Sequence, residues 1–131
     1  MPKPPPKVNV WLFIDGAGVK LRTGSTTTIS ESVTIGNKMN LSLGFLDNGG
    51  RPVSPPVTPD TTPTWSNTAP TVERLIPSVD GLQAVATALA GGSDVINLSV
   101  VVRGANSRAI IQVVIPAPPQ QVLTSVVINA T

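Results

Sequence analysis

The side chains that could perform acid–base chemistry or bind a cation are seven carboxylates, in a chain with no histidine and no cysteine. Without histidine the chain lacks the usual general base, and without both residue types it lacks the common soft ligands for zinc. No two acids form an Asp-x-Asp or Glu-x-x-Glu pair. The seven are Asp15, Glu31, Asp47, Asp60, Glu73, Asp80 and Asp94. We therefore predict that the protein is not an enzyme and has no catalytic, cofactor-binding or metal-binding residues.

Two of the acids are simply explained as turn residues. Asp47 precedes Asn48, and Asp80 precedes Gly81. Asp, Asn and Gly favour turns because their short or absent side chains tolerate positive φ. Asp47, Asn48 and Asp60 could supply some oxygens of a Ca²⁺ site, but calcium needs roughly six to eight such ligands. We prefer the turn interpretation.

The composition indicates a single all-β domain. The 131 residues are enough for one domain with its own core. Hydrophobic residues make up 40% of the chain and charged residues 12%, which argues against disorder. The 14 prolines and 11 glycines would divide the chain into short pieces, and short pieces rich in Val, Ile and Thr favour strands over helices.

The charge pattern predicts no nucleic-acid partner and no membrane insertion. The formal net charge is only +2, and 3% of residues are aromatic, too few for a base-stacking platform. No stretch approaches the ~20 apolar residues that span a bilayer. The apolar run at residues 10–14 is shorter than the roughly 7–15 residues of a signal-peptide core. We expect synthesis in the cytoplasm without a signal peptide.

The N-terminal part contains a strand that is apolar on both faces. In residues 8–14, Val10 lies on one face, and Trp11 and Phe13 lie on the other. Both faces must then be covered, by the domain itself or by another chain. We therefore expect Val10, Trp11 and Phe13 to be candidate interaction residues. A turn at residues 15–18 would lead into a short second strand.

The core strands are predicted from apolar alternation. Residues 38–46 have one apolar face, and residues 96–102 and 109–115 form the clearest hairpin, across a turn at residues 103–108. A tryptophan between small polar residues begins what we expect to be a central strand. The predicted core positions are Trp65, Leu43, Phe45, Leu98 and Val100.

Residues 82–89 allow two interpretations. Asp80 could cap a helix there, yet eight residues are few for a helix and the neighbouring segments are strands. The helical spacing i, i+3, i+4, i+7 is met by Leu82, Val85, Ala86 and Leu89.

The order of these features resembles bacterial immunoglobulin-like domains of the group 2 type. The resemblance covers residues 29–115 and rests on the segments LSLGFLDNGGRPV, PTWSN and SVDGLQAVATALAGG. It implies an immunoglobulin-like antiparallel β-sandwich with extra N- and C-terminal strands, and a strand and turn at residues 82–89. The matching positions are Asp47, Gly50, Val53, Trp65, Pro70, Val72, Gly81 and Gly92.

This resemblance divides the chain into four parts. We expect a proline-rich arm at 1–7, an N-terminal strand and hairpin extension at 8–28, the immunoglobulin-like domain at 29–116, and a C-terminal linker and strand at 117–131. The C-terminal strand contains Val126 and Ile128, further candidate interaction residues.

The terminal strands suggest how such a module could work. They would pair with each other or add to the sheet edge of a neighbouring subunit. The expected partners are thus another protein or further copies of this chain, as a homo-oligomer. By analogy with such domains, we expect a structural or decoration protein of a phage virion. The alternative is an adhesin module that binds carbohydrate or a cell surface.

Overall fold

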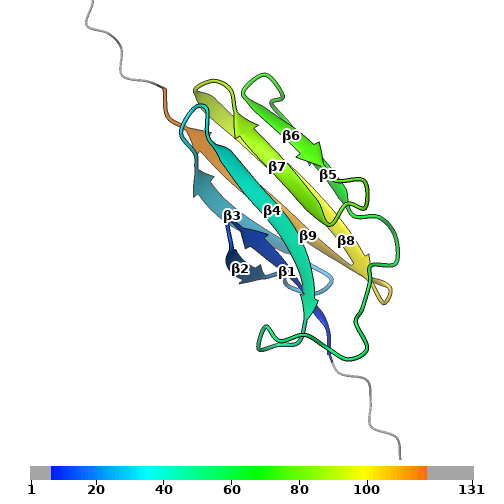
Figure 1. Cartoon of the computed structure of the whole chain (residues 1–131). Coiled ribbons are helices and arrows are strands. Elements are labelled where there is room, and N and C mark those ends of the chain that lie inside the picture. The colour runs from blue at the N-terminus through cyan, green and yellow to red at the C-terminus, as the bar shows by residue number, and fades with distance from the viewer. Residues whose placement is uncertain (1–6, 118–131) are drawn as a thin grey trace, which may run out of the picture.

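The protein is a sandwich of two β-sheets (Figure 1), seen in a computed structural model that describes residues 7–117. The first sheet has the strand order β2-β1-β4-β7-β6 and the second β3-β9-β8-β5. All neighbouring strands are antiparallel except β3 and β9, which are parallel. The strands are β1 (Asn9–Ile14), β2 (Ala17–Lys20), β3 (Thr26–Ser32), β4 (Lys38–Leu46), β5 (Thr64–Asn67), β6 (Glu73–Pro77), β7 (Gln83–Ala88), β8 (Gly92–Val102) and β9 (Ala105–Ile115). The predicted all-β sandwich is confirmed.

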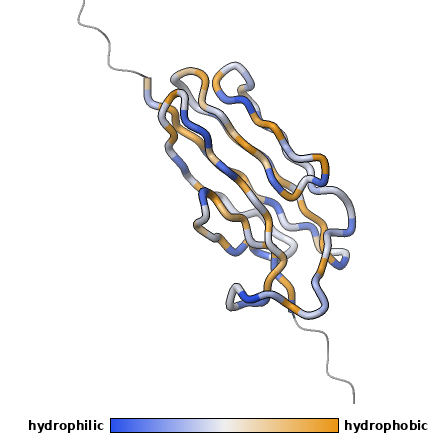
Figure 2. The backbone as a smooth tube through the Cα atoms, viewed as in Figure 1, coloured by the Kyte–Doolittle hydropathy of each residue, from blue (hydrophilic) through white to orange (hydrophobic). Residues whose placement is uncertain are grey.

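The core lies between the inner faces of the two sheets, where every second residue of a strand points inward. Leu98 and Val100 of β8 are fully buried there. Leu43, Phe45 and Trp65 are half-buried and pack against this core. Hydrophobic stretches run along both sheets, and hydrophilic ones occupy several of the loops (Figure 2). Within residues 7–117 there is no helix able to cross a membrane.

Strand β1 is an internal strand of the first sheet. It pairs with β2 on one side and with β4 on the other. Val10 is only 2% exposed and belongs to the core, so the expectation that it meets a partner is wrong. Because both edges of β1 are occupied, β1 has no free edge for the C-terminal strand; Val126 and Ile128 lie outside the described residues. The expected boundary between residues 28 and 29 falls inside β3.

The β8–β9 hairpin is longer than predicted, and its turn is shorter. The turn consists of Arg103 and Gly104, with φ values of 51° and 80°. Two successive positive φ values give the turn the twist that matches antiparallel strands. The expectation of a turn over residues 103–108 is wrong because the inward–outward alternation continues through polar residues. Ser107 is buried opposite Val100.

Trp65 lies at the edge of its sheet. Strand β5 pairs only with β8, so the prediction of a central strand is wrong. The indole N–H of Trp65 donates to the carbonyl oxygen of Gly81, at 2.8 Å, in the turn between β6 and β7. Trp65 therefore connects an edge strand of one sheet to a turn of the other.

The segment at residues 82–89 is a strand in the first sheet. Strand β7 pairs with β4 on one side and β6 on the other. Its inner-face residues, Ala84, Ala86 and Ala88, are buried. Small side chains at these positions bring the two sheets close together, and the two neighbouring strands satisfy the backbone groups that a helix would have paired internally.

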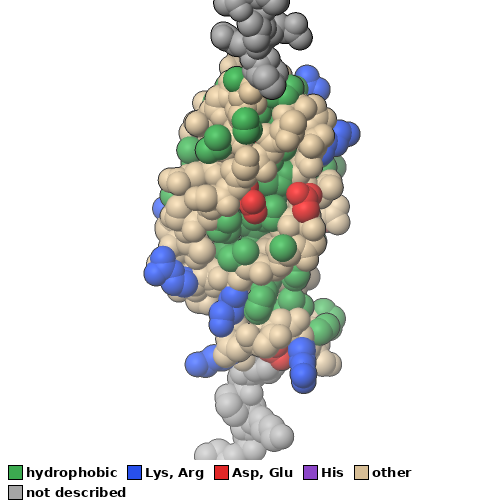
Figure 3. Space-filling view, turned by 90° about the vertical axis from the view of Figure 1, so that its left-hand side faces the viewer, with side chains coloured by type: hydrophobic (Ala, Val, Ile, Leu, Met, Phe, Trp, Pro, Cys, Tyr) green, Lys and Arg blue, Asp and Glu red, His purple; other side chains and the backbone are tan. Residues whose placement is uncertain are grey.

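The flank of the sandwich beside β3 is partly open. Hydrophobic side chains gather in a central band on the side shown in Figure 3, with acidic side chains beside it. On β3, Ile29 points inward opposite Ile111 and is only half-buried, and Glu31 is opposite the buried Val113. A charge on the inward-pointing side of an edge strand disfavours pairing with the edge of another sheet.

Candidate functional site

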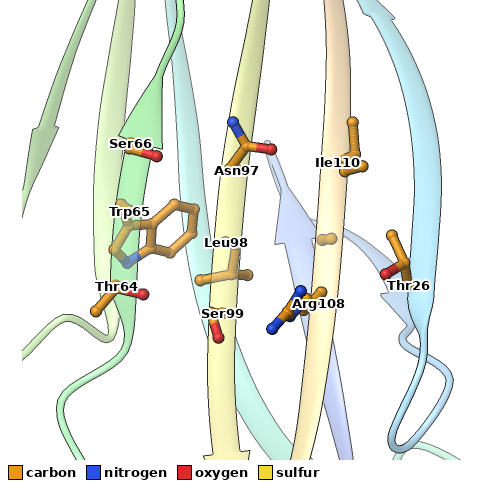
Figure 4. Close-up of a pocket in the computed structure, with 10 residues that line it drawn as sticks. Thr26, Thr64, Trp65, Ser66, Asn97, Leu98, Ser99, Arg108 and Ile110 are labelled. Atoms are coloured by element: carbon orange, nitrogen blue, oxygen red, sulfur yellow. The ribbon is translucent and has the colours of Figure 1, made fainter.

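A trough lies on the outer face of the second sheet, with a volume of about 350 Å³ (Figure 4). The residues that line it come from β3, β5, β8 and β9 and are mostly small and polar. Its size is in the range of small-molecule sites in proteins, roughly 300–1,000 Å³. The lining residues are Thr26, Thr64, Trp65, Ser66, Asn97, Leu98, Ser99, Arg108, Ala109 and Ile110.

The strand register explains why these side chains meet. Residues that are directly paired across a sheet share one face. Thr64 pairs with Ser99, which pairs with Arg108, which pairs with Thr26, so one residue from each strand forms a row across the sheet. The next row on the same face contains Ser66, Asn97 and Ile110. The alternate residues Trp65, Leu98 and Ala109 point to the core side and form the floor.

Arg108 is the only ionisable residue that lines the trough. Its side chain is exposed and extends from β9 towards Ser99 on β8 (Figure 4). No hydrogen bond or ion pair engages its guanidinium group within residues 7–117. Ser99 donates its hydroxyl proton to Asn106 Oδ1, at 2.9 Å, so its oxygen can still accept a hydrogen bond. The trough therefore offers one unpaired cation among neutral donors and acceptors.

An aromatic patch lies on the outer face of the first sheet. Trp11 and Phe13 are half-buried there, on the face opposite to Val10. The Trp11 indole N–H donates to the carbonyl oxygen of Asp47, at 3.1 Å. A Cβ added at Gly18 would lie 2.8 Å from the Phe13 ring, and one at Gly44 would lie 3.0 Å from it. Glycine at these two positions therefore leaves space for the Phe13 ring to lie against the sheet.

The three residues considered for a calcium site form hydrogen bonds within the fold instead. Asp47 Oδ1 accepts hydrogen bonds from the backbone amides of Gly49 and Arg51, at 2.8 and 2.9 Å. Asn48 accepts one from Asn9, and Asp60 instead accepts two from the β8–β9 turn. In the described part of the chain, no group of three or more acidic residues could hold a metal ion.

Two buried acids lie where β5 connects to β6. Glu73 is 0% exposed and Asp94 is 1% exposed. Asp94 accepts hydrogen bonds from the backbone amide of Ala69, the side-chain amide of Asn67 and the hydroxyl of Thr68, at 2.7, 3.1 and 3.3 Å. The hydrogen bonds of Asp94 thus link the connection between β5 and β6 to β8.

Glu73 has no such donors. Neither of its carboxyl oxygens accepts a hydrogen bond. Burial, followed by the effect of the nearby Asp94 carboxyl group, raises the pKa of Glu73 from its ordinary 4.5 to about 8. Glu73 therefore keeps its proton at neutral pH.

The sequence contained a signal for this acid pair, which our prediction missed. Glu73 is two residues from Leu75 in β6, and Asp94 is two residues from Ile96 in β8. In a strand, residues two apart lie on the same face. Extending each apolar alternation by one step would have placed both acids inward.

No model of a protein family matches the chain, and no curated protein sequence matches it either. Function is therefore inferred from the geometry of the two outer faces and of the sandwich itself.

Proposed function

We propose that this protein is a non-enzymatic, immunoglobulin-like structural or interaction module, and that it serves as a structural or decoration protein of a phage virion. The order of the strands is the observation that carries the immunoglobulin-like assignment. In immunoglobulin domains one sheet has the strand order A-B-E-D and the other contains C, F and G. Here β1-β4-β7-β6 and β5-β8-β9 follow these two orders in sequence.

The roles of the acids favour a scaffold over a catalyst. Asp15 accepts a hydrogen bond from the backbone amide of Asn40, and Asp47 and Asp60 stabilise loops in the same way. Asp94 is buried among its donors. Carboxylates that are committed to backbone amides hold the fold in place and are poorly suited to proton transfer.

The edges of β1 and β3 are poorly suited to strand addition by a partner, so we look for the contact on a sheet face. Strand β1 has no free edge, and Glu31 marks the inward side of the edge strand β3. The half-buried rings of Trp11 and Phe13 present part of their apolar surface on the outer face of the first sheet. Aromatic side chains contribute strongly to protein–protein contacts because they bury a large area at a small cost in entropy. We assign contact with neighbouring subunits to this patch.

Light scattering of the full chain over a wide concentration range tests this proposal. We expect a mass above the 13.5 kDa of one chain at high concentration. Ser42→Arg places a bulky cation opposite Phe13 and should return the mass to that of a monomer. Thr87→Arg, on the same outer face but opposite Lys38, is the matched control and should leave the association intact.

Two results would contradict the proposal. A wild-type protein that stays monomeric at every concentration would show that the patch does not join copies of this chain. Association that survives Ser42→Arg would place the contact elsewhere. Circular dichroism of both variants checks that the sandwich is intact.

A second candidate function is an adhesin module that binds carbohydrate. One observation favours it: the polar trough on the second sheet, which lies on a different face from the aromatic patch. The two functions are therefore separable by substitution.

A further inference from the structure

The trough contains an arrangement of groups that the stability of the fold does not require. Arg108 lies in an outward-facing row with Ser99 and Thr26, and its guanidinium group is not paired within residues 7–117. An arginine presents several N–H donors in a planar fork that matches a carboxylate. The trough has no acid among its lining residues, so it is complementary to a negative group.

The remaining lining groups are those that bind hydroxyl groups. Thr64 and Ser66 project from β5, and Asn97 projects from the adjacent β8. Hydroxyl and amide side chains both donate and accept hydrogen bonds. Ile110, half-buried on the same outer face, adds one apolar side chain that can contact the C–H face of a sugar ring.

The geometry points to a saccharide that carries a carboxylate as the ligand of this trough: we infer that Arg108 binds the carboxylate while Ser99, Asn97 and Thr64 bind ring hydroxyls. The volume of about 350 Å³ accommodates a ligand of about one or two sugar rings. The inference goes beyond the virion role proposed above and gives the adhesin alternative a ligand class and a binding residue.

The charge of the trough separates this ligand from a nucleic acid. A nucleic-acid site needs several cations along a phosphate backbone and benefits from exposed aromatic rings. Arg108 is the only cation that lines the trough, and the ring of Trp65 belongs to the core side of the sheet. One carboxylate among several hydroxyls fits one arginine among several polar side chains.

Titrations monitored by backbone-amide NMR test the inference with paired probes. Sialyllactose is compared with lactose, and trigalacturonate is compared with its full methyl ester, which keeps the hydroxyls and loses the charges. We expect the acidic member of at least one pair to shift amide signals of β3, β5, β8 and β9, and its neutral counterpart to bind at least about tenfold more weakly, the difference expected for one charge-assisted contact.

Substitutions locate the site. Arg108→Gln should weaken binding of the acidic saccharide by about tenfold or more. Arg74→Gln makes the same change on an exposed residue of β6, in the other sheet, and should leave binding unchanged. Asn97→Ala should weaken the acidic and the neutral saccharide by the same factor, because it removes a hydroxyl-binding group only.

Three results would overturn the inference, each in a different way. Equal binding of acidic and neutral saccharides would show a neutral-sugar site and leave the adhesin function standing. Binding of sodium acetate with the affinity of the acidic saccharides would show an anion site without sugar recognition. No binding of any of the four saccharides would exclude the trough as a saccharide site, whatever the outcome of the light scattering.

Discussion

The buried acid pair predicts an unusual dependence of stability on pH. Between pH 4.5 and about 8 the folded state keeps a proton on Glu73 that the unfolded chain has released. Because the folded state binds more protons in this window, the free energy of unfolding must fall as the pH rises. The contribution of Glu73 is fully present below pH 4.5 and is lost as the pH rises through about 8.

The size of this effect follows from the shift in pKa. One pKa unit corresponds to about 1.4 kcal/mol, so moving the pKa from 4.5 to about 8 corresponds to about 5 kcal/mol between the ends of the window. Glu73 is 0% exposed, so water does not contact its carboxyl group directly. The chain has no histidine, which removes the side chain that most often titrates in the same window. Asp80, whose pKa is lowered by its hydrogen bonds to Ser78 and Leu82, loses its contribution only below the window.

The substitution Glu73→Gln isolates the contribution of Glu73 to the pH dependence of stability. Glutamine keeps the shape of the protonated acid and carries no group that can ionise. At pH 5 we expect the variant to be within about 1 kcal/mol of the wild type, the net value of one hydrogen bond. At pH 8.5 it should be several kcal/mol more stable, because it has no carboxyl to ionise in the core.

Urea unfolding at intervals between pH 5 and 8.5, followed by tryptophan fluorescence, measures both proteins. Glu31→Gln, the same chemical change on the edge strand β3, should keep the wild-type slope because Glu73 is still present. A wild-type stability that is level across this range would refute the reasoning. So would a Glu73→Gln protein that loses stability with pH as steeply as the wild type.

Further predictions concern the turns and the edge tryptophan. Gly36→Ala should cost about 1–2 kcal/mol, since its φ of +89° is unfavourable for alanine and no atom lies near the new methyl group. Gly81→Ala should cost more than Gly36→Ala in the same urea titration, because its methyl group would lie 2.7 Å from the carbonyl oxygen of Pro63; equal costs would contradict the steric argument. Asp60→Ala removes the acceptor of two amides in the β8–β9 turn and should cost about 1–3 kcal/mol, with faster hydrogen exchange of those two amides as the direct readout. Trp65→Phe should cost about 1 kcal/mol through the lost hydrogen bond to Gly81, and a thermal melt that matches the wild type would show that this bond contributes nothing.

The class of the fold and most of its strands could be predicted from the amino-acid sequence. Alternation over residues 38–46 and 96–102 predicts inner faces that carry Met39, Leu41, Leu98 and Val100, and all four are buried. This works because side chains in a strand alternate strictly between two faces, so a local pattern determines which residues enter the core. The same rule, applied to polar residues, would have revealed the acid pair.

Which strands become neighbours, and which sheet faces stay open, could be learned only from the folded chain. Nothing local distinguishes β5, at a sheet edge, from a central strand, or shows that β1 is enclosed between β2 and β4. Residues 83–88 form a strand despite the helical spacing of their apolar residues, because the neighbouring strands β4 and β6 pair with this segment on both sides. The trough arose in the same way, since its rows join residues from four strands as distant in sequence as Thr26 and Arg108. Strand pairing is non-local, and only the assembled sheet brings such residues onto one face.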